Sequence, residues 1–175
     1  MWDTLIAVLG TLAGGALVAY PQRAADRAAR TERHQQEVTG ALIALLKAVL
    51  KYRESYWLMV ASLRDGTGET SDQRADRFRL RTEITLARDL LALVAPGSTL
   101  VDLGEKAAWA AIDLSDIPLG AVNNGTFNPA TEAALTAGRE QSRDTHTALR
   151  QAGSAYLSTR SRPRLPTPEP NQLHS

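Results

Sequence analysis

The fold is decided by residues 38–63, which read VTGALIALLKAVLKYRESYWLMVASL. The apolar residues of this stretch recur at alternating spacings of four and three: Val38, Leu42, Leu45, Val49, Tyr52, Tyr56, Met59 and Leu63. Such a period places them on one face of an α-helix. A neighbouring stripe widens the face with Ile43, Leu46, Leu50, Trp57 and Val60. A narrow seam would favour a coiled-coil dimer, whereas a wide face that contains aromatic rings favours the core of a helix bundle.

Two further helices are predicted downstream of this stretch. Two glycines in DGTGET, residues 65–70, end the first helix, and Ser71 offers the N-cap of the next. That second helix runs to about Ala95, where Pro96 and Gly97 stop it. It carries an apolar stripe of Leu80, Ile84, Ala87, Leu91 and Val94.

The third predicted helix begins at Ser98 or Thr99, with Asp102 placed as in a capping box. It ends near Asp116 and carries apolar residues at Val101, Ala108, Trp109, Ala111 and Ile112. Residues 117–128 then form a loop, in which Asn123-Asn124-Gly125 favours a tight turn or a small hairpin between Val122 and Phe127.

The last predicted helix follows Asn128-Pro129, a cap residue with proline at the first helical position, and ends near Leu157. Its apolar stripe is weak and consists of Ala134, Gly138, Thr145, Leu149, Ala152 and Tyr156. The composition from Ser158 onward is polar and rich in proline, which is typical of a disordered tail.

The N-terminal residues predict a membrane anchor. Residues 4–18 carry no charge, and Trp2 and Tyr20 stand where amphipathic rings suit a water–lipid boundary. As a helix, this segment spans about 28 Å, close to the hydrocarbon core of a bilayer. A cleaved signal peptide fits poorly because Asp3 lies where basic residues are expected. A buried N-terminal helix of a soluble protein remains the alternative.

Two groups of residues in and beside the anchor are candidate functional positions. A groove of small residues for helix association in lipid is formed by Ala7, Gly10, Thr11, Gly14 and Gly15. The juxtamembrane basic residues are Arg23, Arg27, Arg30 and Arg33. Their position predicts a single-pass protein of the cell membrane whose C-terminal domain is cytoplasmic. The small residues equally fit ordinary alanine and glycine content, so self-association is one of two interpretations.

We therefore predict an all-α protein with an N-terminal transmembrane helix, a helical stalk and a small antiparallel helical bundle. The predicted boundaries are residues 1–21 for the anchor, 22–37 for the basic stalk, 38–158 for the bundle and 159–175 for the tail. Pro21 is expected to end the anchor or to kink it.

No catalytic chemistry is apparent in the sequence. The net charge is +1 and there is no cysteine, which excludes a thiol nucleophile and a thiolate metal site. His34, His146 and His174 are widely separated, and no phosphate-binding loop is present. Asp113 and Asp116 lie close in sequence, but carboxylates near a helix end are usually solvated. We expect no enzymatic activity, no cofactor and no metal site.

Two arginine clusters give a weak case for nucleic-acid binding. The first cluster lies on the second bundle helix and consists of Arg74, Arg77, Arg79, Arg81 and Arg88. The second cluster lies in the tail and consists of Arg160, Arg162 and Arg164. Acidic residues are interspersed with the first cluster, so a salt-bridged helix surface is the better interpretation. Direct nucleic-acid binding is not expected, although the tail leaves contact with lipid or DNA open.

Several runs of the sequence resemble the KilB proteins of Streptomyces conjugative plasmids. They are MWDTLIAVLGTLAGGALVAY, ALIALLKAVLKYRESYW, RTEITLARDLLAL, AAWAAIDLSDIPLG and SRDTHTALRQAGSAYL. The resemblance implies a small membrane-associated protein that takes part in plasmid transfer and in the spread of plasmid through recipient mycelium. It implies other plasmid transfer proteins as partners and offers no catalytic residue. A membrane-anchored adaptor or regulator unrelated to conjugation is the alternative.

Overall fold

The computed structural model describes the backbone of residues 2–160 and the side chains of residues 25–159. This part of the chain is helical throughout, apart from its turns and loops. The elements are α1 (Trp2–Arg64), α2 (Ser71–Val94), α3 (Thr99–Ile112), the short 3₁₀ helix η1 (Asp113–Asp116) and α4 (Pro129–Arg160). The predicted all-α class is therefore confirmed. The hairpin considered around the 123–125 turn is reduced to an isolated bridge between Asn123 and Thr126.

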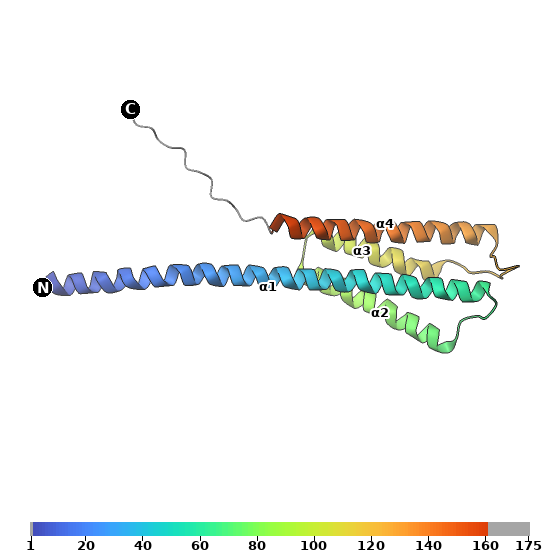
Figure 1. Ribbon diagram of the computed structural model, residues 1–175, viewed down its shortest axis with the longest axis horizontal. Helices are drawn as coiled ribbons and strands as arrows, with labels where there is room; N and C mark the ends of the chain where they lie inside the picture. Colours follow the sequence, from blue (N-terminus) through green and yellow to red (C-terminus); the bar gives the residue numbers. More distant parts are fainter. Residues whose placement is uncertain (1, 161–175) are drawn as a thin grey trace, which may run out of the picture.

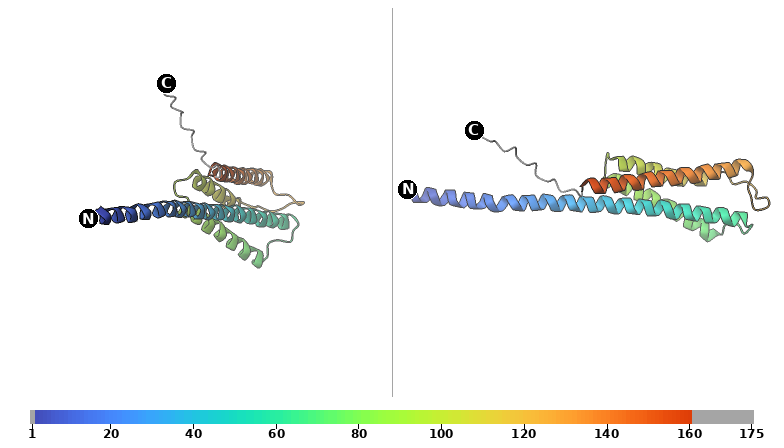
Figure 2. Two further views of the ribbon diagram at one scale, coloured as in Figure 1. Left: turned by 60° about the vertical axis from the view of Figure 1, so that its left-hand side comes forward. Right: turned by 45° about the horizontal axis from the view of Figure 1, so that its top comes forward.

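The four α-helices form an elongated antiparallel bundle (Figure 1). Each helix runs opposite to the one before it in the chain, so α1 and α3 point one way and α2 and α4 the other (Figures 1 and 2). Helix α1 packs most extensively against α2, and α3 packs most extensively against α4. The bundle interpretation of residues 38–63 is thus confirmed over the coiled-coil dimer.

Helix α1 is 63 residues long and extends far beyond the other three helices (Figure 1). The predicted anchor, stalk and first bundle helix belong to this one element. Pro21 lies inside it, so the prediction that Pro21 ends the helix is wrong. The side chains of residues 1–24 lie outside those the structure describes, and with them most of the predicted anchor. In the described part of the chain, no helix has a stretch that is both long and apolar enough to cross a membrane, and the transmembrane prediction is not confirmed.

The first predicted stripe of α1 forms the part of the bundle core that α1 contributes. Val38, Leu42, Leu45, Val49, Tyr52 and Tyr56 are all buried, and Met59 and Leu63 are partly buried. The second stripe is only partly correct, because Ile43 is 58% exposed and Leu50 is 54% exposed. These two positions lie about 120–140° around the helix from Val38 and so turn away from the core.

Helix α3 lies close to its neighbours because its inner face is made of small residues. The buried residues of this face include Gly104, Ala107, Ala108, Ala110 and Ala111. A Cβ on Gly104 would lie 2.9 Å from Leu91 Cδ2 and 3.0 Å from Leu45 Cδ2. The missing side chain therefore lets α3 approach both α1 and α2.

One helix start differs from the predicted one, and one predicted capping box does not form. The N-cap of α2 is Thr70, one residue before Ser71, and Thr70 and Gln73 form a reciprocal capping box. The N-cap of α3 is Ser98, and no side-chain hydrogen bond caps that helix. The capping box predicted between Thr99 and Asp102 does not form because Thr99 is already inside the helix.

The start of α4 is capped as predicted, since Asn128 Oδ1 accepts from the Thr131 N–H at 2.9 Å. The inner face of the helix is only partly predicted: Leu149 is buried, but Leu135, Ser142 and Gly153 are buried as well. The helix ends at Arg160, three residues beyond Leu157, and the rest of the predicted tail lies outside the described residues.

Candidate functional site

The free part of α1 carries the juxtamembrane basic residues. Every side chain from residue 25 to residue 37 is exposed except that of Gln35, which is half-buried. Arg27, Arg30 and Arg33 are therefore open to solvent, and none forms an ion pair with a described residue. Arg23 lies outside the described side chains. So do the five residues of the predicted association groove, Ala7, Gly10, Thr11, Gly14 and Gly15.

The residues considered for acid–base chemistry are not brought together. Asp113 and Asp116 are both exposed on η1, in agreement with solvated carboxylates. His34 is exposed on the free part of α1, His146 is half-buried against α1, and His174 lies outside the described residues. Within the residues the structure describes, no group of His, Cys, Asp or Glu side chains has a geometry that would hold a metal ion.

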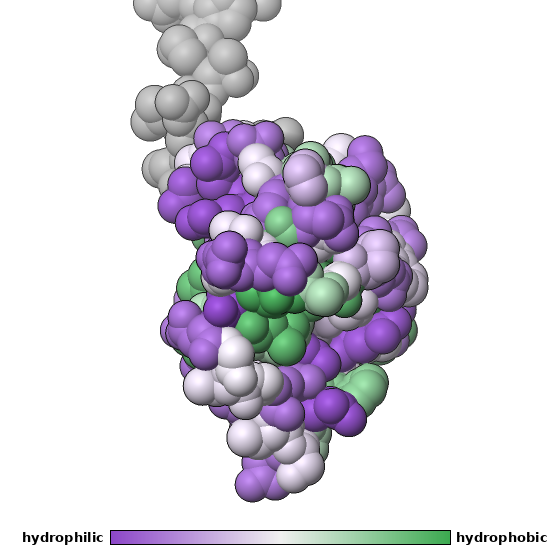
Figure 3. All heavy atoms as spheres, turned by 90° about the vertical axis from the view of Figure 1, so that its right-hand side faces the viewer, coloured by the Kyte–Doolittle hydropathy of each residue, from purple (hydrophilic) through white to green (hydrophobic). Residues whose placement is uncertain are grey.

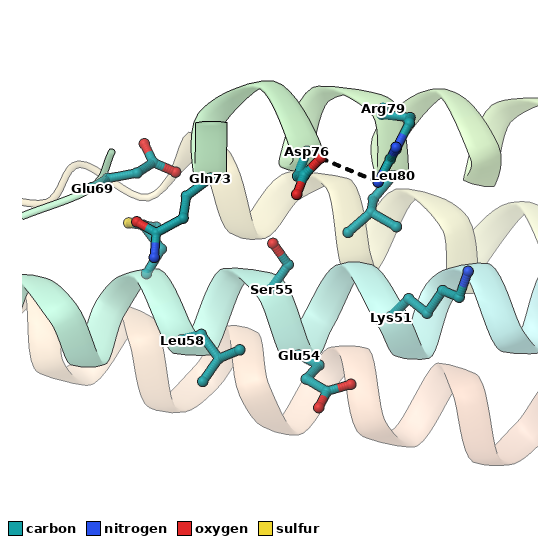
Figure 4. A pocket seen from close by; sticks show the side chains of 10 residues that line it. Lys51, Glu54, Ser55, Leu58, Glu69, Gln73, Asp76, Arg79 and Leu80 are labelled. Atoms are coloured by element: carbon teal, nitrogen blue, oxygen red, sulfur yellow. Dashed lines mark ion pairs between the residues drawn. The ribbon is translucent and has the colours of Figure 1, made fainter. Parts of the chain in front are cut away.

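A groove of about 380 Å³ lies between α1 and the first turns of α2 (Figure 4). Its apolar lining includes Leu58, Met59 and Leu80, and its polar lining includes Lys51, Glu54, Ser55, Glu69, Gln73, Asp76 and Arg79. Several of these charges are engaged: Asp76 lies 3.1 Å from Arg79, and Glu69 lies 2.8 Å from Arg77. No imidazole lines the groove beside Ser55, so it lacks the nucleophile–base pair that acyl transfer needs.

The end of the bundle that bears residues 65–70 and the 117–128 loop shows an apolar recess within a largely polar surface (Figure 3). A separate small core lies at this end, with Tyr56, Val60, Leu114, Phe127 and Leu135 buried. The partly buried apolar residues around it are Trp57, Met59, Leu63, Ile117, Leu119 and Val122. An ion pair between Arg64 and Glu132 lies beside this core, with the Arg64 guanidinium 5.7 Å from the centre of the Phe127 ring.

The predicted arginine cluster of α2 is largely neutralised by acidic partners. Arg74 and Arg77 both contact Glu69, and Arg79 contacts Asp76. Arg88 contacts Asp89 at 2.8 Å and lies 5.6 Å above the ring of Trp109. The salt-bridged surface favoured from the sequence is therefore what this helix presents.

A second group of basic residues, which was not predicted from the sequence, lies where α4 passes α1. We call it the seam row: Arg139, Arg143, His146 and Arg150 of α4, with Arg53 of α1. The α4 members are spaced by four, three and four residues, which places them on one face of the helix. Arg139 lies 5.6 Å above the ring of Trp57, which joins the row to α1. Arg53 is 86 positions from Arg139, so no sequence window contains both.

Two members of the seam row, Arg53 and His146, have lowered pKa values. Burial lowers the pKa of Arg53 below its usual value, and the positive charges of Arg139 and Arg143 lower it further. Burial also lowers the pKa of His146, with smaller contributions from Arg53 and Arg150, although a hydrogen bond to the Leu46 backbone acts in the opposite direction. The positive charges of the row therefore lie close enough to one another to lower the pKa values of Arg53 and His146.

Comparison with known proteins identifies the family. The family model described as KilB plasmid transfer protein matches residues 39–157, which span the bundle from the start of its core to the last turns of α4. No curated protein and no solved structure matches the chain. Because the match covers well over half of the residues, the chain belongs to the KilB plasmid transfer protein family.

Proposed function

We propose that this protein is a non-enzymatic, membrane-associated component of conjugative plasmid transfer that promotes the spread of plasmid through recipient mycelium. The observation that carries the proposal is the family match, which extends over the whole folded bundle. The role in spread, as a finer function, follows from the resemblance of the sequence runs described above.

The membrane association rests on residues 1–21. Their uncharged run is followed by Arg23, Arg27, Arg30 and Arg33, and the last three of these side chains are exposed. Exposed arginines at the end of an apolar helix favour retention of that end on the cytoplasmic side. We propose a single-pass orientation in which the bundle is cytoplasmic and α1 connects it to the membrane.

The non-enzymatic role is supported by the surface of the bundle. The carboxylates of the α1–α2 groove are partly held in ion pairs, and the groove has no histidine in its lining. A rigid bundle of this kind is suited to recruiting or positioning other transfer proteins. The small residues Gly10 and Gly14 offer a route by which two copies would associate.

The function is tested by mating. Donors would carry the plasmid with the intact gene, with the gene deleted, or with a variant lacking residues 1–21, and the radius of plasmid spread in the recipient would be measured. We expect the deletion and the anchorless variant to reduce spread to a similar extent while the first transfer into the recipient continues. Arg74→Ser with Arg81→Ser is the control and should spread normally.

Undiminished spread after deletion of the whole gene would refute the role in transfer. The alternative, an adaptor or regulator unrelated to conjugation, would then be the remaining interpretation. Undiminished spread by the anchorless variant alone would refute the membrane mechanism. The two results separate the function from the way in which it is carried out.

A further inference from the structure

The seam row has the geometry of a binding site for a linear anion. From Arg139 to Arg150, eleven residues of helix rise about 16 Å, and neighbouring members lie about 4.5–6 Å apart along the axis. Arg139, Arg143 and Arg150 are exposed, while Arg53 is half-buried beneath them. The three arginines of α4 are therefore open to solvent, while His146 and Arg53 of the row are half-buried.

The charges of the row are poorly compensated. Arg53, Arg139 and Arg150 form no ion pair within the described part of the chain, and Arg143 contacts only its neighbour Asp144 at 3.3 Å. The acidic residues nearest in sequence, Glu54 and Glu140, each follow an arginine of the row by one position. They are therefore turned by about 100° from it. The arginines of α2, in contrast, nearly all have a carboxylate partner.

Two buried hydrogen-bond donors lie in the same seam without a partner. The Arg53 Nε–H and the Trp57 Nε1–H are inaccessible to solvent, and neither finds an acceptor. A buried donor left unpaired destabilises the fold, so such groups are usually paired when their surroundings are complete. Both donors are covered, so an anion in the seam would be held by the exposed guanidinium groups of Arg139, Arg143 and Arg150.

We propose that the seam row binds the phosphate backbone of double-stranded nucleic acid without reading its sequence. Phosphates on one strand advance about 3.4 Å along a duplex axis, so the row is as long as four to five of them. Arginine suits phosphate because its planar fork donates two parallel hydrogen bonds. This inference goes beyond the proposed function, which names no ligand for the bundle.

The same residues argue against other polyanions. The Trp57 ring beside the row already lies beneath Arg139, and the His146 ring of the row is half-buried, so neither offers a fully free face on which the bases of a single strand would stack. A membrane surface is disfavoured by distance, since Arg53 lies 32 residues beyond Pro21, or about 48 Å along a helix. A duplex beside the bundle needs neither a free aromatic ring for base stacking nor a position close to the membrane.

The test measures binding of the full chain, kept soluble in a neutral detergent, to a fluorescent 20-base-pair duplex. Fluorescence anisotropy would be recorded at several salt concentrations for three proteins. The first is the unaltered chain, and the second carries Arg139→Gln, Arg143→Gln and Arg150→Gln. The third is a control with the same loss of charge on α2: Arg74→Gln, Arg79→Gln and Arg81→Gln. Circular dichroism melts establish that all three are folded.

We expect the seam-row variant to bind about tenfold or more weakly at low salt. The slope of log affinity against log salt concentration should fall by about two to three, because each lost phosphate contact removes close to one unit. The α2 control should keep both the affinity and the slope. Duplexes of unrelated sequence should bind equally well, since phosphate contacts carry no sequence information.

Three results would overturn the proposal. They are an equal loss of affinity in the two variants, tighter binding to a 20-nucleotide single strand than to the duplex, and binding of the row to vesicles of anionic phospholipid in place of nucleic acid. Because binding is measured without mating, its failure leaves the proposed role in transfer untouched.

Discussion

Glu132 joins α4, the preceding loop and the end of α1 through a single carboxylate. Its Oε2 lies 2.6 Å from Arg64 Nη2, and its Oε1 accepts from the Phe127 N–H at 3.0 Å. The Arg64 guanidinium also lies 5.7 Å from the centre of the Phe127 ring. One side chain thus holds together the last turn of α1 and the segment that leads into α4.

Substitution of Glu132 should separate these two contacts. Glu132→Gln keeps an acceptor for Phe127 but removes the ion pair, which is partly solvated, so we expect a loss of about 0.5–1 kcal/mol of unfolding free energy. Glu132→Ala also leaves the Phe127 N–H unpaired, and the loss should reach about 2 kcal/mol. Urea denaturation measures both. Equal values for the two variants would show that the backbone contact contributes nothing.

His146 gives the bundle a pH dependence of known sign. Its pKa is lowered in the folded state, so the unfolded chain binds a proton more readily. Stability should therefore fall as the pH decreases from above the ordinary histidine pKa of about 6.5 down to the lowered value, and this contribution should then level off. His146→Gln should flatten that part of the profile in urea denaturation between pH 5 and 8. A profile unchanged by the substitution would contradict this assignment.

The residues that the sequence did not reveal are those whose role depends on a partner from another helix. His146 gave no sign of burial because its neighbours in sequence are polar, yet it packs against α1 near Leu46. Arg53 lay within the predicted first helix, but only the passage of α4 beside it creates the seam row. By contrast, the buried stripe from Val38 to Tyr56 was evident because helical periodicity is a local property.

At the scale of whole elements, two glycines inside helices have opposite surroundings. A Cβ added to Gly153 in α4 would overlap Leu42 of α1, whereas nothing lies within 4 Å of the position that a Cβ on Gly40 would occupy. Gly153 therefore sets the distance between α1 and α4. Gly40 only weakens its helix.

These surroundings predict changes of stability with opposite sign. Gly153→Val should destabilise the bundle by about 1–3 kcal/mol because a packed interface has no room for the added groups. Gly40→Ala should stabilise it by up to about 1 kcal/mol through helix propensity alone. Thermal melts followed by circular dichroism would measure both. A destabilised Gly40→Ala would mean that this exposed position is in contact after all.

The number and order of the bundle helices were predictable because their ends carry local signals. Pro96 and Gly97 separate α2 from α3, and Asn128 with Pro129 begins α4. The N-cap of α2 was misplaced by one residue, since the neighbouring Thr70 and Ser71 are almost equivalent as cap residues. The inner face of α4 was predicted incompletely because Gly153 and Ser142 fill close-packed positions where a periodicity search looks for large apolar residues.

At the scale of the molecule, the folded core and the N-terminal segment are separable. Among the side chains that the structure describes, from residue 25 onward, the first buried core residue is Val38, and the side chains of residues 25–34 are all exposed. Deletion of residues 1–21 should therefore leave the helix content per residue and the cooperativity of unfolding of the bundle unchanged. The proposed anchor predicts that the same deletion moves the protein from the membrane pellet to the supernatant after centrifugation.

These two measurements have separate controls. The pelleting experiment would include a high-salt wash, which removes proteins held only by exposed arginines such as Arg27 and Arg30. If the unaltered protein is released by salt, attachment is electrostatic and the anchor prediction is wrong. Loss of cooperative unfolding in the deleted form would show that the N-terminal residues belong to the core.

The 63-residue length of α1 has a mechanical consequence. At 1.5 Å per residue, the helix is about 94 Å long, and only its C-terminal part packs against the other bundle helices. A tilt of 10° at one end displaces the other by about 16 Å, and a rotation about the axis passes along a hydrogen-bond ladder that lacks one bond at Pro21, which has no N–H. Torque applied at the free end would thus turn the whole bundle as one body, and with it the direction in which the seam row faces.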